Sequence, residues 1–553
     1  MSETLEKLLG DPWDPANPMN HAAVVAADER QEMFAEGERL LDEYGLNAEF
    51  VPAGLGGRLT GVDRLVRVMR SVWRRDPALG LGYGASSFIA SVNVWAAGDD
   101  GQRRAFADLM LANRKIASVY HELAHGNDFA RAEFAATPGP GGRLLLNGRK
   151  EVVTNLRRAD SLVVFARTSA EEGSRSHSQL FVHKADLPPD RMTYLPRFPS
   201  AGMRGVQLGG VVFDDCPIPD GSVLGTPGRG IETALRSFQL TRTALPSMMA
   251  GVVDTGLRAT LRFATARTLY GRNVAAIPQV RSTLAEVYAD LLACDAFGTV
   301  AARALHLLPG EASVYASLVK YTVSKQLIDA MDRLSLVLGA HFYIRQGTYA
   351  VFQKLLRDLG VIGFGHAARV ACLATVLPQI PQLARRSWLI AGDPPADLFR
   401  IGADLPPLDF AALRPSAAGH ESLSSAVLAD AASPGEPGEV AALAGLFADE
   451  LVLLKRDAAA LRPRDLGVDA RPEALGVAAR YAAVLAASSC LNVWRAGGGD
   501  PGWVVAALTR LAGRLGRGSG RLPEAVARRL FDELLDRHGE NRGFDLAGLP
   551  LPG

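Results

Sequence analysis

The sequence is poor in cysteine, in lysine and in net charge. Its four cysteines among 553 residues lie 78 or more positions apart and form no CxxC pair, so neither a disulfide framework nor a structural zinc site is expected. Sixty basic residues against 59 acidic ones leave a formal charge of +1, which excludes a general electrostatic attraction for nucleic acid or an anionic membrane. Only eight of the basic residues are lysines. Because the net charge is so small, any partner must be recognised through contacts at a particular site.

The chain also lacks recognisable targeting segments. Residues 1–13 are acidic and contain no apolar core of signal-peptide length, and no later stretch approaches the ~18 uncharged apolar residues of a membrane span. We therefore expect a cytoplasmic protein without a membrane partner. With 48% hydrophobic and 22% charged residues, the composition is that of a globular chain with room for roughly three to four domain-sized units.

Hydrophobic spacing predicts helices at both ends of the chain and strands between them. Apolar residues recur every three to four positions in 61–75 and again in a long stripe over 314–338, as in amphipathic helices. Between 116 and 213, short β-rich runs alternate with Gly/Pro turns, as in antiparallel sheets. Further helices are expected near 438–461, 473–495, 501–515 and 523–538.

These patterns predict a mostly α fold with a central antiparallel β domain, in the α+β class. The expected segments are an N-terminal helical domain (1–115), the β domain (116–228), a helical bundle (229–388), a proline-rich linker (389–419) and an additional helical domain (420–553). The last domain is expected to pack on the bundle and to contribute none of the chemistry. In its first helix, Asp449, Glu450 and Lys455 are expected to lie on a solvated edge.

The densest polar cluster is the segment HELAHGND at residues 121–128. Its first five letters match the zinc-protease pattern HExxH, in which two histidines on one helical face hold the metal. However, a strand-like run precedes the segment and a Gly-Asn-Asp turn ends it. We therefore expect that the required helix is absent and that no metal binds.

Two further clusters are polar but ambiguous by themselves. The segment GRKEVVTN at 148–155, followed by Ala159 and Asp160, reads as the edge of a β-hairpin. The segment RTLYGR at 267–272 places two guanidiniums beside a glycine turn, where they could bind a pyrophosphate or simply face solvent.

Taken in order, these segments resemble the motifs of the acyl-CoA dehydrogenase family of flavoproteins. HELAHGND is similar to the family's TEPxxGSD run, and GRKEVVTN is similar to GxKxWITN. The resemblance continues through FDDCPIP at 213–219, RTLYG at 267–271, and GAHFY at 339–343 with Arg-Asp at 357–358. It covers roughly residues 20–385 and identifies the chain as a divergent member with a C-terminal helical extension.

The resemblance implies a helical domain, a β-barrel domain and a bundle, with FAD between the last two. Thr154 would contact the flavin ring, with His121 and Asn127 at the signature positions that hold Thr and Ser in the family. Arg267 would bind the pyrophosphate of a neighbouring subunit's FAD, and the turn at Gly339 its adenine half. Such a site needs a homodimer or homotetramer. Gln279 is an uncertain substitute for a further FAD-facing glutamine, which aligns with Pro278.

The family's catalytic glutamate is missing. It lies nine residues after the arginine of the Arg-Asp pair, a count that leads from Arg357 to His366. Some members carry it before a helix arginine, a position held here by Thr241 before Arg242. A neutral imidazole, with an ordinary pKa of ~6.5, could replace the carboxylate as base. His366 could equally cap the following helix.

The resemblance, with its departures, therefore implies an FAD-dependent oxidoreductase acting on an acyl-CoA or an acyl carrier protein, in an atypical α,β-dehydrogenation suited to a specialised biosynthetic pathway. Arg242 is a candidate substrate-binding residue. A flavin-dependent monooxygenase or oxidase on the same scaffold, in which a base is dispensable, is the enzymatic alternative. A non-catalytic assembly partner is the other.

Overall fold

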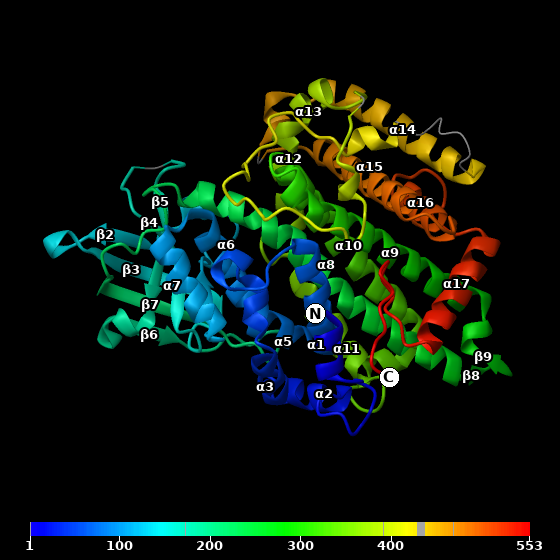
Figure 1. The fold of residues 1–553 in the computed structure, drawn as a ribbon, viewed down its shortest axis with the longest axis horizontal. Coiled ribbons are helices and arrows are strands. Elements are labelled where there is room, and N and C mark those ends of the chain that lie inside the picture. The colour runs from blue at the N-terminus through cyan, green and yellow to red at the C-terminus, as the bar shows by residue number, and fades with distance from the viewer. Residues whose placement is uncertain (1, 172, 391, 429–436, 468) are drawn as a thin grey trace. The chain divides into compact units, whose positions relative to one another are not determined.

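The computed structural model describes residues 2–171, 173–390, 392–428, 437–467 and 469–553 (Figure 1). Two compact units make up the chain. The helical unit consists of Met1–Ala22, Gly61–Arg75 and Arg242–Gly553, and the sheet unit consists of Ala23–Thr60 and Asp76–Thr241. Each unit thus joins segments that are distant in sequence, whereas the four predicted domains and the linker are each contiguous, and those boundaries stay predictions.

The first 115 residues are helical, as predicted. The helices are α1 (Ser2–Leu9), α2 (His21–Glu29), α3 (Ala35–Tyr44), α4 (Val62–Arg75), α5 (Pro77–Leu79), the π-helical η3 (Gly80–Ala85), α6 (Ser86–Ala97) and α7 (Asp100–Leu111). Local sequence explains their ends. Asp99 and Gln102 form a reciprocal capping box at the start of α7, and Gly45, at φ 65°, ends α3.

The sheet unit contains a curled, seven-stranded sheet among its described residues. Its strands are β1 (Ile116–Val119), β2 (Ala135–Pro138), β3 (Leu144–Thr154), β4 (Ser161–Arg167), β5 (His177–His183), β6 (Met192–Leu195) and β7 (Leu208–Pro217). The strand order is β1-β4-β2-β3-β7-β6, with β5 beside β4. Its inward side chains, including Leu146, Val164 and Phe213, form one apolar core.

The expectation of a purely antiparallel sheet is wrong at one place. β4 pairs in parallel with β1 and, through one residue pair, with β2, whereas the other pairs are antiparallel. The parallel pairing is possible because the whole β2–β3 hairpin lies in the connection between β1 and β4, and parallel neighbours need such a long crossover.

Long helices and a small hairpin follow the sheet. They are α8 (Gly230–Ala266), the hairpin of β8 (Thr268–Leu269) and β9 (Arg272–Asn273), α9 (Pro278–Leu307), α10 (Ala312–Leu338), η9 (Gly339–Tyr343), α11 (Ala350–Leu359), η10 (Gly360–Gly363), α12 (Arg369–Val376) and α13 (Ile380–Arg386). The predicted stripe at 314–338 is α10, most of whose apolar side chains are buried.

The four helices predicted near the C-terminus are confirmed. They are α14 (Gly438–Ala459), α15 (Pro472–Gly497), α16 (Gly502–Arg514) and α17 (Glu524–Gly539). The last three pack against α9 (Figure 1), which agrees with an extension that covers the bundle. Pro501 and Pro523 stand at the N-cap positions of α16 and α17.

One sequence-based expectation about this region is wrong. Glu450 was expected on a solvated edge of α14, but it is buried and pairs with Arg480 at 2.5 Å and Arg517 at 3.3 Å. By length and composition alone, helix α15 could span a membrane, but 78% of its most apolar window is buried within the fold, as in the core helix of a bundle.

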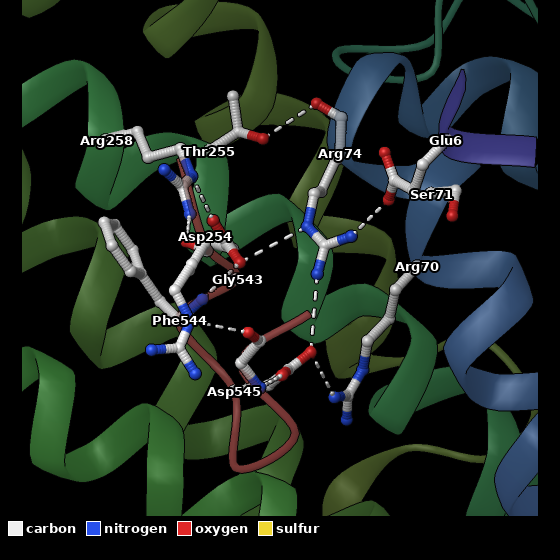
Figure 2. Close-up of polar contacts among 12 residues, drawn as sticks. Glu6, Arg70, Ser71, Arg74, Asp254, Thr255, Arg258, Gly543, Phe544 and Asp545 are labelled. Carbon is white, nitrogen blue, oxygen red and sulfur yellow. Dashed lines mark hydrogen bonds and ion pairs between the residues drawn. The ribbon is translucent and has the colours of Figure 1, made fainter. Parts of the chain in front are cut away.

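A buried ion-pair network joins both ends of the chain inside the helical unit (Figure 2). Arg74 on α4 contacts Glu6 at 2.5 Å, Asp254 at 3.3 Å and Asp545 at 3.4 Å. Beside it, the Phe544 backbone N–H donates to Asp254 at 3.0 Å, and the Arg258 guanidinium lies 3.9 Å from the Phe544 ring centroid. One guanidinium thus links α1, α8 and the tail after α17.

Candidate active site

The HELAHGND segment forms a turn that is fixed to strand β3. Residues 123–127 are a turn instead of a helix, so the two histidines do not share a helical face. The Glu122 carboxylate accepts the backbone N–H groups of Glu133 and Phe134 and pairs with the Lys150 ammonium at 2.8 Å. Among the described residues, no His/Cys/Asp/Glu group suited to a metal ion occurs.

The Glu122–Lys150 pair is buried, and each partner favours the charged form of the other. Burial would raise the pKa of Glu122, but the charge of Lys150 and its hydrogen bond outweigh this and hold that pKa below its usual range. Burial lowers the pKa of Lys150 to about 8, with Glu122 opposing the shift. Lys150 also donates to the Tyr120 carbonyl at 2.9 Å. The pair therefore holds the backbone at Tyr120 and Glu122, the residues on either side of His121.

His121 and Asn127 present polar groups from this turn. The His121 backbone carbonyl accepts the N–H of Glu151 at 2.9 Å, which aligns the turn with β3. Burial, followed by the charge of Lys150, lowers the pKa of His121, so its imidazole is neutral at pH 7. Asn127 is exposed at the tip. A neutral imidazole and an amide can each donate and accept hydrogen bonds.

Thr154 is positioned by strained backbone on either side. Val152 has a φ of 57°, a genuine outlier for a β-branched residue, in a register shift between Lys150 and Val153. Asn155 has a φ of 59°, and its buried amide donates to the Gly82 carbonyl and, at 3.0 Å, to Ser86 Oγ. The π-helical turn of η3 thus holds the end of β3, while the Thr154 hydroxyl has no hydrogen-bond partner among the described residues.

The helical unit carries the other expected cofactor residues. Arg267 lies exposed at the end of α8, with its guanidinium 6.0 Å from the Phe263 ring centroid and no ion pair among the described residues. Gly339 ends α10 at φ 55° and ψ −139°, a conformation that essentially only glycine adopts. Gln279 lies exposed at the start of α9, where its amide is 3.4 Å from Thr283 Oγ1.

These groups fit a flavin dinucleotide. A free hydroxyl, a neutral imidazole and an exposed amide in the sheet unit match a ring system that both donates and accepts hydrogen bonds. An exposed guanidinium matches a pyrophosphate, which it can bind bidentately. Arg267 and Gly339 belong to the helical unit and Thr154 to the sheet unit.

Neither position expected for a catalytic carboxylate holds one. Thr241 is fully buried on α8, and its hydroxyl donates to the Phe238 carbonyl one turn earlier at 3.2 Å. It therefore cannot act as a base. The neighbouring Arg242 is buried too, with Nη1 3.5 Å from Ser317 Oγ of α10, and burial lowers its pKa.

His366 lies in a strained loop between η10 and α12. It has a φ of 58°, and Ala367 after it has a φ of 92°, so two consecutive non-glycine residues occupy the left-handed region. Its side chain is partly exposed. The N-cap residue of α12 is Ala368, with no side-chain cap. His366 therefore does not occupy the N-cap position of α12.

Sequence analysis missed Lys320, a buried residue of α10. Its Nζ donates to the Ile362 carbonyl at 2.8 Å, four residues before His366. A usable signal existed, because a lysine within an apolar helix is conspicuous in a chain with eight lysines in all. The Glu122–Lys150 pair was also missed, although both residues belong to quoted motifs.

The comparisons with known proteins agree with these motifs. Residues 118–216 match the model of the acyl-CoA dehydrogenase middle domain, and residues 228–365 match that of the acyl-CoA dehydrogenase C-terminal domain. The mitochondrial isovaleryl-CoA dehydrogenase of Pongo abelii is 25% identical over 328 residues, which cover 59% of this chain and 76% of that protein.

Solved structures share the fold at lower identity. Butyryl-CoA dehydrogenase of Megasphaera elsdenii superposes with a TM-score of 0.60 at 19% identity, covering 67% of this chain and 96% of that one. An acyl-CoA dehydrogenase of Bacillus anthracis, solved with FAD, reaches 0.71 at 16% identity and covers 98% of this chain and 87% of that one. Through its middle and C-terminal domains, the chain belongs to the acyl-CoA dehydrogenase family.

Proposed function

We propose that the chain is an FAD-dependent oxidoreductase that removes hydrogen from the α and β carbons of an acyl thioester. The proposal is supported by family membership and by the polar groups of Thr154, His121 and Arg267, which suit a flavin dinucleotide. The acyl group would be carried by CoA or by an acyl carrier protein. Because Arg267 is expected to reach a neighbouring subunit's cofactor, the active form would be a homodimer or homotetramer.

His366 is the proposed base for the α-proton. The observation that carries this assignment is the pair of left-handed residues at 366 and 367, since such strain persists where the surrounding structure enforces it and is common at active sites. The neutral imidazole would accept the proton at one ring nitrogen, and the bound FAD would supply the hydride acceptor. Arg242 is proposed to contact the substrate.

An oxygen-dependent reaction is the second candidate. The absence of a carboxylate at both 241 and 366 favours it, because a flavin monooxygenase or oxidase needs no base of that kind. Rapid reaction of the reduced protein with O₂ would support this candidate, and slow reaction would support a dehydrogenase. A specialised biosynthetic role and a cytoplasmic location are part of the proposal.

Flavin content tests the proposal as a whole. Purified protein should be yellow, with the absorbance of bound FAD, and an acyl thioester substrate should bleach that absorbance anaerobically. Protein that is colourless and takes up no FAD would instead indicate a non-catalytic assembly partner.

A further inference from the structure

The C-terminal extension borders a cavity that the proposed reaction does not use. This cavity, the extension cavity, has a volume of about 480 Å³ and lies between the start of α9, the end of α10 and the loop that follows α16. Such a volume is within the range of small-molecule sites, roughly 300–1,000 Å³. All of its lining residues belong to the helical unit. Arg510, Ser519 and Arg521 come from the extension, outside the residues that match the family's C-terminal domain.

The loop after α16 is rich in glycine and has free backbone donors. Gly516, Gly518 and Gly520 have φ values of 73°, 88° and 65°. In the described part of the chain, no acceptor is found for the backbone N–H groups of Gly518, Ser519 and Gly520. Gly520 is buried, and the backbone N–H groups of buried residues nearly always have an acceptor. Successive N–H groups beside left-handed residues form concave anion sites in many proteins. The loop therefore has donors to offer to an anionic ligand.

The loop is fixed to α16 without a ligand. A Cβ atom on Gly513 would lie 2.2 Å from the Cα of Gly520, so the helix and the returning loop pack backbone against backbone. The Arg510 guanidinium donates to the Gly520 carbonyl at 2.7 Å, and the N–H of Arg517 donates to the Ala512 carbonyl at 3.0 Å. The free N–H groups are therefore held in place before a ligand binds, which lowers the entropic cost of binding.

One guanidinium of the extension cavity has no carboxylate partner. Arg333 and Arg510 both pair with Glu286, and Arg510 also contacts Asp290 at 2.8 Å. Arg521 is exposed and makes no ion pair among the described residues. With Glu286 and Asp290 set against Arg333 and Arg510, the charge of Arg521 is left uncompensated. The cavity therefore suits an anion.

An adjoining hollow of about 450 Å³ is less suited to an anion. It shares Arg333 and Arg510 with the extension cavity and adds Arg514. However, the carboxylates of Asp329 and Asp332 line it as well, and burial, followed by the charge of Asp329, raises the pKa of Asp332. Because these carboxylates would repel an anion, we expect it in the extension cavity.

The remaining lining of the extension cavity offers hydrogen-bonding and apolar side chains from α9 and α10: Gln279, Val280, Ser282, Thr283, Leu336 and Val337. Leu336 is 79% exposed. A ligand that combines a phosphate with an apolar ring would cover this side chain while its anionic end meets Arg521. A guanidinium matches a phosphate well, because it can bind two of the oxygens at once.

We propose that the extension cavity binds the phosphate end of a nucleotide-sized ligand other than the flavin. The Arg521 guanidinium pairs with the phosphate, the N–H groups of Ser519 and Gly520 donate to its oxygens, and Leu336 packs against the base. Gln279 alone among the lining residues is also a candidate for contact with the flavin. The inference does not rest on the proposed function, because it needs neither bound FAD nor turnover.

Binding of ADP to the full-length protein tests the site. In a calorimetric titration at constant ionic strength, with excess FAD present to fill any flavin site, ADP should bind. Adenosine, which lacks the phosphates, should bind about tenfold or more weakly. Arg521→Ala should weaken ADP binding by a similar factor, because one charge-assisted contact is lost.

Arg464→Ala is the matched control for this titration. Arg464 is an exposed arginine of the extension that likewise makes no ion pair among the described residues, so its variant should bind ADP as the parent does. The inference would be overturned by absent ADP binding, by equal binding of adenosine, by parent affinity in Arg521→Ala, or by an equal loss in the control.

Hydrogen exchange locates the bound phosphate. Saturating ADP should slow amide exchange in residues 515–521, because N–H groups that donate to the phosphate become protected. Adenosine should leave the exchange of this loop unchanged. If ADP bound but the exchange of residues 515–521 stayed the same, the phosphate would lie elsewhere and the inference would fail.

The use of FAD as a competitor separates the inference from the proposed function. If FAD abolished ADP binding that is seen in its absence, the phosphate site would be the flavin's own, and the inference would fail while the proposed function stood. If the protein took up no FAD but bound ADP through Arg521, the proposed function would fail and the inference would stand.

Discussion

Three non-glycine residues near the proposed site have an unusual backbone conformation. Val152, His366 and Ala367 all have positive φ values without being glycine, and all lie beside residues with proposed roles. Sequence motifs singled out Thr154 and His366 as candidates, because motifs record residue types at fixed spacing, and the roles of both stay predictions. The positive φ values around them could not be predicted, because they arise only in the folded chain, where Asn155 contacts η3 and Lys320 contacts η10.

Arg267 provides a test of cofactor binding at this scale. Replacing Arg267 with alanine should lower the flavin occupancy of purified protein, because a pyrophosphate would lose a charge-assisted hydrogen-bond partner. Occupancy is measured by the ratio of flavin to protein absorbance. Arg385→Ala, at an exposed arginine of α13, is the control and should keep full occupancy. Full occupancy in Arg267→Ala would refute the assignment.

His21 provides a test of pH dependence. It is buried against Trp13, and burial, followed by the charge of Arg75, lowers its pKa to about 3. Between pH ~6.5 and 3, His21 is protonated in the unfolded chain but neutral in the folded chain. The free energy of unfolding is therefore unaffected by His21 above pH ~6.5 and decreases as the pH falls from ~6.5 toward 3. His21→Leu should flatten the dependence of unfolding free energy on pH in that window. Replacement of the exposed His420 by leucine should not.

Helices could be predicted from the sequence where the pattern that indicates them lies within the helix itself. The helices α10 and α14–α17 follow apolar spacing, so their ranges agree closely with those expected. The parallel pairing of β4 and the burial of Glu450 were missed, because both depend on partners distant in sequence. The same holds for the network around Arg74, which has no sequence signature.

The Arg74 network gives a test at the scale of elements. Asp545→Asn and Glu6→Gln should each lower the free energy of unfolding by about 3 kcal/mol, since each leaves a buried guanidinium short of a partner. The double variant should lose less than the sum, because both carboxylates contact Arg74. Urea denaturation measures all three. Glu3→Gln, at an exposed residue of α1, is the control and should leave the free energy of unfolding unchanged. A double variant that lost the exact sum of the two single losses would contradict the view that both carboxylates bind the same guanidinium.

At the scale of the whole molecule, the C-terminal extension is part of the helical unit. Helices α15–α17 pack on α9, and the tail places Asp545 against Arg70 and Arg74. A chain ending near Leu413 would expose the apolar face of α9 and leave these arginines without that carboxylate. It should therefore be insoluble or molten, as measured by near-ultraviolet circular dichroism. A soluble truncated chain that kept FAD and substrate but lost turnover would place chemistry in the extension.

The turnover of His366→Ala tests the central claim most directly. With the true substrate, the variant should lose on the order of 10² to 10⁴-fold in rate, as expected for a missing general base, while its flavin absorbance stays unchanged. Parent turnover should rise with pH as the imidazole loses its proton, and His366→Glu should recover simple acyl-CoA dehydrogenation. A parent rate in His366→Ala would show that the reaction begins from an already acidic carbon or needs no α-deprotonation.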